Sequence, residues 1–187
     1  QTSPNTPMNT PQATSEAQSY WASRSHFNYY KTVRMLLDRF GPLESILDIG
    51  CADTPVATWG WFDHRYTVDV MERPPLDNVR AIVGSWPEVP KEPRKWSVIC
   101  CLQVLEHLPA DVLRRAISAI MRRSQMFIVS VPYNWRPHAC PYHLHDPITL
   151  DKFLSWMRGL KPSWIDCVQD DNLNRIVALF DTSREKL

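Results

Sequence analysis

The chain has 187 residues, of which 44% are hydrophobic and 22% charged, as expected for one globular domain with a core of its own. Lysine and arginine number 21 against 20 aspartates and glutamates, so no overall basic excess favours nucleic-acid binding. No apolar run approaches the roughly 20 residues that span a membrane, and no signal peptide is visible. The five cysteines have no paired spacing, which favours a reducing compartment and a cytoplasmic location.

The N-terminal part changes character once. The first 18 residues are polar and proline-rich, so we expect a flexible tail before a single domain at 19–187. From 19 to 40, apolar residues recur at the spacing of one helix face, until Gly41 and Pro42 end the predicted helix. Its first half is rich in aromatic residues, which is consistent with packing onto the domain or with a lid over a substrate pocket.

The rest of the chain alternates between strand and helix patterns. We expect strands at 46–49, 65–70, 79–83, 96–102 and 126–131. We expect helices at 56–62, 110–124 and 150–157. The last two predicted strands, 164–168 and 175–180, are joined by a short polar connector, which predicts an antiparallel hairpin. The alternation predicts a three-layer α/β fold around a mostly parallel sheet.

Two acids stand where the first two strands end. Asp48 interrupts a buried strand that Gly50 follows, and ligands of open α/β sheets bind beyond such strand ends. Asp69 closes the second strand, where a carboxylate can accept hydrogen bonds from a ribose diol. A dinucleotide site would carry further glycines, but Ala52 and Thr54 follow here, so a nucleoside cofactor without phosphates fits better.

Four short motifs carry a family resemblance. They are Ile-Leu-Asp-Ile-Gly-Cys-Ala-Asp, Thr-Val-Asp-Val, Val-Gly-Ser-Trp and Val-Leu-Glu-His-Leu-Pro, in this order. Over residues 44–133 the chain resembles a class I S-adenosylmethionine-dependent methyltransferase. The resemblance implies a Rossmann-like sheet of seven strands with the last one antiparallel. It also implies S-adenosyl-L-methionine as cofactor and S-adenosyl-L-homocysteine as product.

The resemblance assigns cofactor contacts by position. At the methionine end it implies Asp48, Gly50 and Ala52, and at the ribose Asp69. It implies Ser85 and Trp86 beside the adenine, with Leu102, Gln103 and Val104 as the floor near the sulfonium. The family usually has glycines at Ala52 and Thr54 and an acid at Ser85, and these departures could weaken or reshape cofactor binding.

Histidines provide the candidate acid–base groups. Methyl transfer to an oxygen nucleophile needs a base or a metal to take up its proton. The predicted loop at 132–149 should overhang the same sheet edge, so we expect His107, His143 or His145 to act as the general base. The alternative is that these histidines only hydrogen-bond the loop to the domain.

A metal is a second hypothesis for the same residues. Glu106, His107, His143 and His145 resemble the ligand set of the small-RNA 3′-terminal 2′-O-methyltransferases. Gln103 stands where that family has its first glutamate, which removes a charged ligand, and we therefore assign no metal. A zinc site with His138 and Cys140 matches no standard spacing.

The sequence therefore predicts a small methyltransferase acting on an oxygen or nitrogen of a natural-product-like small molecule. Aromatic residues of the N-terminal helix and of the loop at 132–149 would wall the acceptor pocket. One alternative is an RNA or peptide methyltransferase with a metal-assisted site. The other is a non-catalytic scaffold that has kept the fold. We expect a small-molecule substrate as the partner, and neither a nucleic acid nor a membrane.

Overall fold

The computed structural model describes residues 19–91 and 95–183, and the predicted tail at 1–18 lies outside them. The helices are α1 (Tyr20–Arg24), α2 (Asn28–Asp38), α3 (Ala110–Arg123) and α4 (Leu150–Trp156), with the single 3₁₀ turns η1 (Val56–Thr58) and η2 (Leu105–His107). The strands are β1 (Leu43–Ile49), β2 (Phe62–Asp69), β3 (Val79–Val83), β4 (Trp96–Leu102), β5 (Ser124–Tyr133), β6 (Trp164–Asp170) and β7 (Leu173–Asp181).

The seven strands form one sheet in the order β3-β2-β1-β4-β5-β7-β6. Strands β1 to β5 run parallel, whereas β7 runs antiparallel to both β5 and β6. The predicted mostly parallel sheet with a C-terminal antiparallel hairpin is therefore confirmed. The carboxyl ends of β1, β2 and β4 lie at one edge, which places the loops that follow them side by side.

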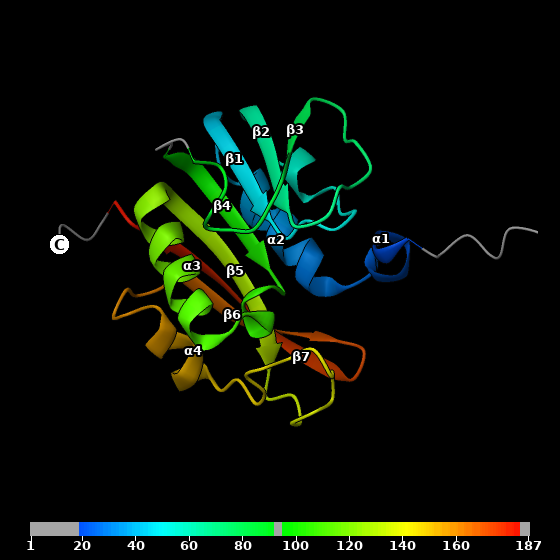
Figure 1. Ribbon diagram of the computed structural model, residues 1–187, viewed down its shortest axis with the longest axis vertical. Coiled ribbons are helices and arrows are strands. Elements are labelled where there is room, and N and C mark those ends of the chain that lie inside the picture. The colour runs from blue at the N-terminus through cyan, green and yellow to red at the C-terminus, as the bar shows by residue number, and fades with distance from the viewer. Residues whose placement is uncertain (1–18, 92–94, 184–187) are drawn as a thin grey trace, which may run out of the picture.

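Helices cover both faces of this sheet, which confirms the three-layer arrangement. In Figure 1, α3 and α4 lie in front of the strands and α2 lies behind them. Strand β4 shows why, because all seven of its residues are buried and successive side chains enter opposite faces. Ile99 packs with the cluster under α3, and Val98 packs with the cluster under α2.

The predicted helix at 19–40 is broken into α1 and α2. Phe27 has an extended backbone, with φ −62° and ψ 138°, and it offers no side-chain cap to α2. The carboxylate of Asp170 takes over that role, since it accepts hydrogen bonds from the backbone N–H groups of Asn28 and Tyr29. The break therefore results from a contact with the distant hairpin rather than from a glycine or proline.

The predicted helix at 56–62 is reduced to the single turn η1. Strand β2 begins at Phe62, three residues before its predicted start, and leaves no room for a longer helix. The guanidinium of Arg65 donates hydrogen bonds to the carbonyl oxygens of Ala57, Trp59 and Gly60, at 2.8, 3.0 and 2.8 Å. These bonds satisfy acceptors that helical N–H groups would otherwise have filled.

Two further properties bear on the expected class of protein. Within 19–91 and 95–183, no helix combines the length and the apolar character that a membrane span requires. The five cysteines are free thiols, and Cys100 and Cys101 are buried in β4 as small hydrophobic residues.

Candidate functional site

Two adjoining cavities open at the carboxyl edge of the sheet. One has a volume of about 160 Å³ and the other about 280 Å³. They share the lining residues Gly50, Asp69, Arg73, Gln103 and His107. The smaller cavity adds Asp48, Ala52 and Leu102, and the larger adds Ser85, Trp86 and Val104. The fold thus brings all nine predicted cofactor residues to one cleft.

Asp48 presents an unpaired oxygen to this cleft. Its side chain is buried, and its Oδ2 has no hydrogen-bond partner among the described residues. Burial raises the pKa of Asp48 to about 8, against a hydrogen bond from Thr54 that lowers it, and the nearby Asp69 raises it further. A buried acceptor without a partner is costly, so a ligand that donates a proton or carries a positive charge is favoured here.

Gly50 is required by the backbone at the end of β1. It adopts φ +69°, in the left-handed region, and its N–H donates to the carbonyl of Val68 at 2.7 Å. A Cβ at this position would lie 2.4 Å from Cγ2 of Val104. Any larger residue would push Val104 into the cleft, so the glycine keeps the floor open.

Asp69 lies at the end of β2, as expected, but it is already engaged. Its Oδ2 accepts from the N–H of Ala52 at 2.9 Å, and its Oδ1 accepts from the N–H of Met71 and from Nη2 of Arg73, both at 3.0 Å. Burial disfavours the charge of Asp69, but these hydrogen bonds outweigh it and lower the pKa of Asp69. The second site on Oδ2 accepts only the long hydrogen bond from the thiol of Cys51, at 4.0 Å, which a ribose hydroxyl could replace.

Helix α1 lies at the mouth of the smaller cavity, where Tyr20 and Tyr30 line it. The carboxylate of Asp53, in the loop after β1, accepts hydrogen bonds from Oγ of Ser19 and from the backbone N–H of Trp21, the latter at 2.7 Å. These contacts connect the start of α1 to the loop that follows β1. The arrangement agrees with the lid interpretation of the N-terminal segment.

A second group of titratable side chains meets at the turn η2. Glu106 is completely buried, and neither of its side-chain oxygens accepts a hydrogen bond within the described part of the chain, although Oε1 lies 4.0 Å from Nε2 of His107. Burial raises the pKa of Glu106 to about 8. Its carboxylate, His107 and His143 place one potential ligand atom each within 4.8 Å of one another.

Both histidines of this cluster use Nδ1 for a hydrogen bond and keep Nε2 for other contacts. Nδ1 of His107 donates to the carbonyl of Tyr142 at 3.0 Å, and Nδ1 of His143 donates to Oδ2 of Asp146 at 2.7 Å. Each Nε2 is therefore the basic nitrogen. The ring centroids lie 4.8 Å apart, and burial lowers the pKa of His107. Such a pair can accept a proton or ligate a cation.

The other residues that were considered as bases or metal ligands lie outside the cluster of Glu106, His107 and His143. Nε2 of His145 donates to the carbonyl of Leu108 at 2.7 Å, so this histidine fastens the loop to the domain. Gln103 binds Ser130 and Arg175 through its amide rather than the cluster. His138 and Cys140 lie on the loop at 134–149 outside the cluster. The catalytic role of His107 and His143 stays a prediction.

Three residues of the site escaped the sequence analysis. Asp53 ends the first motif, but its contacts with Ser19 and Trp21 lie more than 30 residues away in the sequence, and Arg73 binds Asp69 four residues before it without belonging to any motif. Asp146 carried a usable signal, because it follows His143 by three residues, and that spacing brings the two side chains together in a turn.

The sequence itself matches no protein-family model and no curated protein. Solved structures do resemble this fold. The N-methyltransferase NodS of Bradyrhizobium japonicum, in complex with S-adenosyl-L-homocysteine, is 14% identical over 88% of each chain, with a TM-score of 0.67. The 1,6-didemethyltoxoflavin-N1-methyltransferase of Burkholderia thailandensis is 18% identical over 87% of this chain and 83% of that one, with a TM-score of 0.69. The methyltransferase domain of a bacterial Hen1 is 17% identical over 82% of this chain and 94% of that one, with a TM-score of 0.55.

These likenesses and the strand order agree with the resemblance of the motifs. The chain has the fold of the class I S-adenosylmethionine-dependent methyltransferases.

Proposed function

We propose that this protein is a methyltransferase that uses S-adenosyl-L-methionine and methylates an oxygen or nitrogen of a small-molecule acceptor. The observation that carries the proposal is the double cavity at the ends of β1, β2 and β4, with the unpaired oxygen of Asp48 in it. The donor set fits the cofactor, because a buried acid faces the methionine end and a second acid ends β2. When bound, S-adenosyl-L-methionine supplies an electrophilic methyl group.

The protein's own residues would bind and orient this cofactor. Asp48 would accept a hydrogen bond from the amino group, and Asp69 would accept one from a ribose hydroxyl. Trp86 and Ser85 would border the adenine in the larger cavity. Bound cofactor and acceptor would displace water from the cleft, and positioning would then provide most of the rate enhancement.

The acceptor would bind between α1 and the histidine cluster. Tyr20 and Tyr30 lie on one side of the cleft, and Trp135 stacks on His143 at a centroid distance of 5.3 Å. Nε2 of His143 would take the proton of the acceptor, and Asp146 would hold the resulting imidazolium. Two of the similar structures are N-methyltransferases, one of them with 1,6-didemethyltoxoflavin bound, which supports a small planar acceptor.

Calorimetric titration with S-adenosyl-L-homocysteine tests the cofactor site. We expect micromolar binding by the wild type, and a loss of at least about tenfold in affinity for Asp69→Asn because a charge-assisted hydrogen bond is removed. Asp63→Asn is the matched control, since Asp63 is an exposed acid at the other end of β2. If the wild type binds no ligand, the enzyme proposal is wrong and the scaffold alternative gains support.

Turnover with a panel of phenols and amines tests the base. We expect His143→Ala to lower kcat by about 10²- to 10⁴-fold, with unchanged affinity for S-adenosyl-L-homocysteine. His138→Asn is the control on the same loop, because asparagine tolerates its left-handed backbone at φ +64°. Unchanged turnover in His143→Ala, with the fold intact, contradicts the base role.

A metal-assisted reaction is the second candidate, with RNA as its acceptor. The specific observation in its favour is the cluster of Glu106, His107 and His143, in which the buried glutamate accepts no hydrogen bond from the described residues. Asp146 holds the ring of His143 as outer carboxylates do for metal-bound histidines. A bound divalent cation would polarise the attacking hydroxyl and lower its pKa.

Titration of Mn²⁺ and of Zn²⁺ into metal-free protein tests this candidate without turnover. We expect saturable binding by the wild type and at least about tenfold weaker binding by Glu106→Gln and by His143→Ala. His138→Asn should bind as the wild type does. Equal binding in all four proteins would assign the cation to another site and leave the base mechanism.

A further inference from the structure

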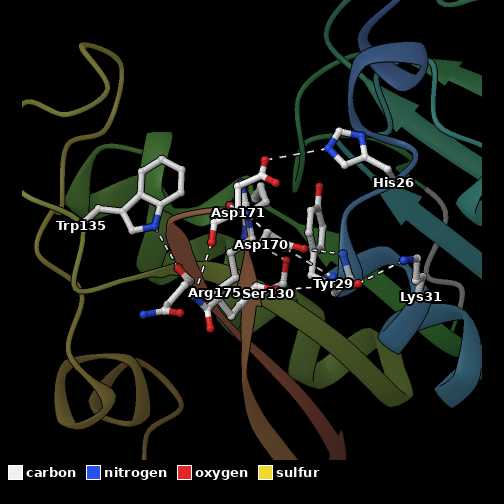
Figure 2. A network of polar contacts seen from close by, with 12 residues as sticks. His26, Tyr29, Lys31, Ser130, Trp135, Asp170, Asp171 and Arg175 are labelled. Atoms are coloured by element: carbon white, nitrogen blue, oxygen red, sulfur yellow. Dashed lines mark hydrogen bonds and ion pairs between the residues drawn. The ribbon is translucent and has the colours of Figure 1, made fainter.

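Arg175 is buried in an aromatic cage on β7. Its guanidinium carbon lies 4.8 Å from the ring centre of Phe27, 4.9 Å from that of Tyr29 and 5.3 Å from that of Trp135. These rings come from the segment before α2, from α2 itself and from the loop after β5. Figure 2 shows Arg175 beside Asp170, with Trp135 on one side and Tyr29 on the other. The side chain is 7% exposed, so its geometry is determined by the protein.

The guanidinium joins two parts of the molecule through hydrogen bonds. Nη1 donates to Oδ2 of Asp170 at 3.0 Å, and Nε donates to Oε1 of Gln103 at 3.2 Å. The same Asp170 carboxylate accepts from the N–H groups of Asn28 and Tyr29, which begin α2. One arginine therefore connects the start of α2 and the β6–β7 hairpin with the segment after β4.

Gln103 is the point where this connection reaches the cleft. It lines both cavities and has φ +56°, a left-handed backbone that side chains disfavour. Its N–H donates to the carbonyl of Ser130 at 2.8 Å, and its Nε2 donates to Oγ of Ser130 at 3.0 Å. The hydrogen bond from Arg175 fixes the amide oxygen of Gln103, and the bond to Ser130 fixes its amide nitrogen.

The rings of the cage reach the other walls of the site. Tyr29 contacts Tyr30, which lines the smaller cavity, at a centroid distance of 4.1 Å. Trp135 stacks on His143 of the titratable cluster. Arg175 thus contacts Tyr29, which packs on the cavity-lining Tyr30, and Trp135, which stacks on His143. It also donates a hydrogen bond to Gln103, which lines both cavities.

We propose that Arg175 is a positioning residue that holds Gln103, and with it the floor of the cofactor cleft, in its binding geometry. It acts through the Arg175–Gln103 hydrogen bond, and Asp170 keeps the guanidinium in the orientation that makes this bond possible. Docking of α2 and the hairpin is thereby linked to cofactor affinity. This inference rests on the proposed function, since it concerns the same cleft.

A double-mutant cycle tests it, with affinity for S-adenosyl-L-homocysteine as the readout. The single variants are Arg175→Met, which keeps the apolar contacts with the cage, and Gln103→Asn, which keeps the left-handed backbone but is too short to reach Arg175. We expect each to weaken binding by about tenfold, and the double variant to lose no more than either single variant. Arg175→Lys should not restore the affinity, because lysine lacks the guanidinium fork.

Val177→Ala separates positioning from stability. Val177 is fully buried on the same strand, so the variant should lower the melting temperature without weakening ligand binding. Losses that add in the double variant, or a loss in Val177→Ala that scales with its melting temperature, overturn the inference while the cofactor site stands. A wild type that binds no ligand overturns the proposed function, and this inference with it. If Arg175→Met does not fold, Arg175→Lys takes its place in the cycle.

Discussion

Arg73 binds the carboxylate that the proposed cofactor would need. It occupies Oδ1 of Asp69 at 3.0 Å and lines both cavities, where a ribose diol would need that acid. We expect Arg73→Ala to strengthen binding of S-adenosyl-L-homocysteine by about threefold to tenfold, since partly exposed ion pairs contribute about 1 kcal/mol or less. Calorimetry compares it with Arg80→Ala, an exposed arginine on β3. Weaker binding by Arg73→Ala would show instead that the arginine contacts the ligand.

Asp48 makes the stability of the ligand-free protein depend on pH. Burial raises its pKa from 3.8 to about 8, so the folded state binds a proton that the unfolded state has released. Its contribution to stability is complete below the unfolded value and is lost as the pH rises towards about 8. We expect the free energy of unfolding to fall by about 1 kcal/mol between pH 7 and pH 8 for this reason. Urea unfolding at each pH measures it.

Asp48→Asn is the control for this pH effect, because the amide does not titrate. Its free energy of unfolding should fall less steeply over the same interval, because only Glu106, whose pKa burial also raises to about 8, then contributes. The other titratable groups that line the smaller cavity are Asp69, Arg73, His107, Tyr20 and Tyr30. The lowered pKa of His107 acts in the opposite sense, but only below its ordinary value of 6.5, outside this interval. Equal slopes in both proteins would contradict the assignment to Asp48.

At the scale of elements, α1 is held by Asp53 and by the packing of Trp21 against Tyr30 and Trp59. It has five residues, none of them buried, and Asp53 binds its first turn. We expect Asp53→Ala to release the helix, speed amide exchange at 20–24 and weaken binding of S-adenosyl-L-homocysteine a few-fold, with less than about 1 kcal/mol lost in global stability. Asp38→Ala, an exposed acid on α2, should change none of these. Unchanged exchange in Asp53→Ala would contradict the lid interpretation.

The same scale shows what local sequence can predict. The bounds of β4 were predicted correctly because six of its seven residues are apolar and the segments on both sides are polar. The break between α1 and α2 was missed because its cause, the bond from Asn28 to Asp170, spans 142 residues. The residues that line the cleft could be predicted to meet because parallel strands end at one edge. His145 was one of the candidate bases, but its Nε2 donates to the carbonyl of Leu108, a contact that no local sequence pattern predicts.

Across the whole molecule, the two apolar layers share the strands of one sheet. Ile46 and Leu47 of β1 enter opposite clusters, as Val98 and Ile99 of β4 do. Neither layer can lose its packing without exposing the back of strands that the other layer needs. The domain should therefore unfold as one cooperative unit, in spite of the few helices that cover it.

Substitutions on opposite faces test this cooperativity. Leu37 of α2 is fully buried in one cluster, and Ile117 of α3 is 3% exposed in the other. We expect Leu37→Ala and Ile117→Ala each to lower the free energy of unfolding by about 2–5 kcal/mol, through lost burial and the cavity left behind. Far-UV circular dichroism and tryptophan fluorescence should give the same midpoint in each variant. If one variant separates the two probes into distinct transitions, the layers unfold independently, which contradicts the single cooperative unit.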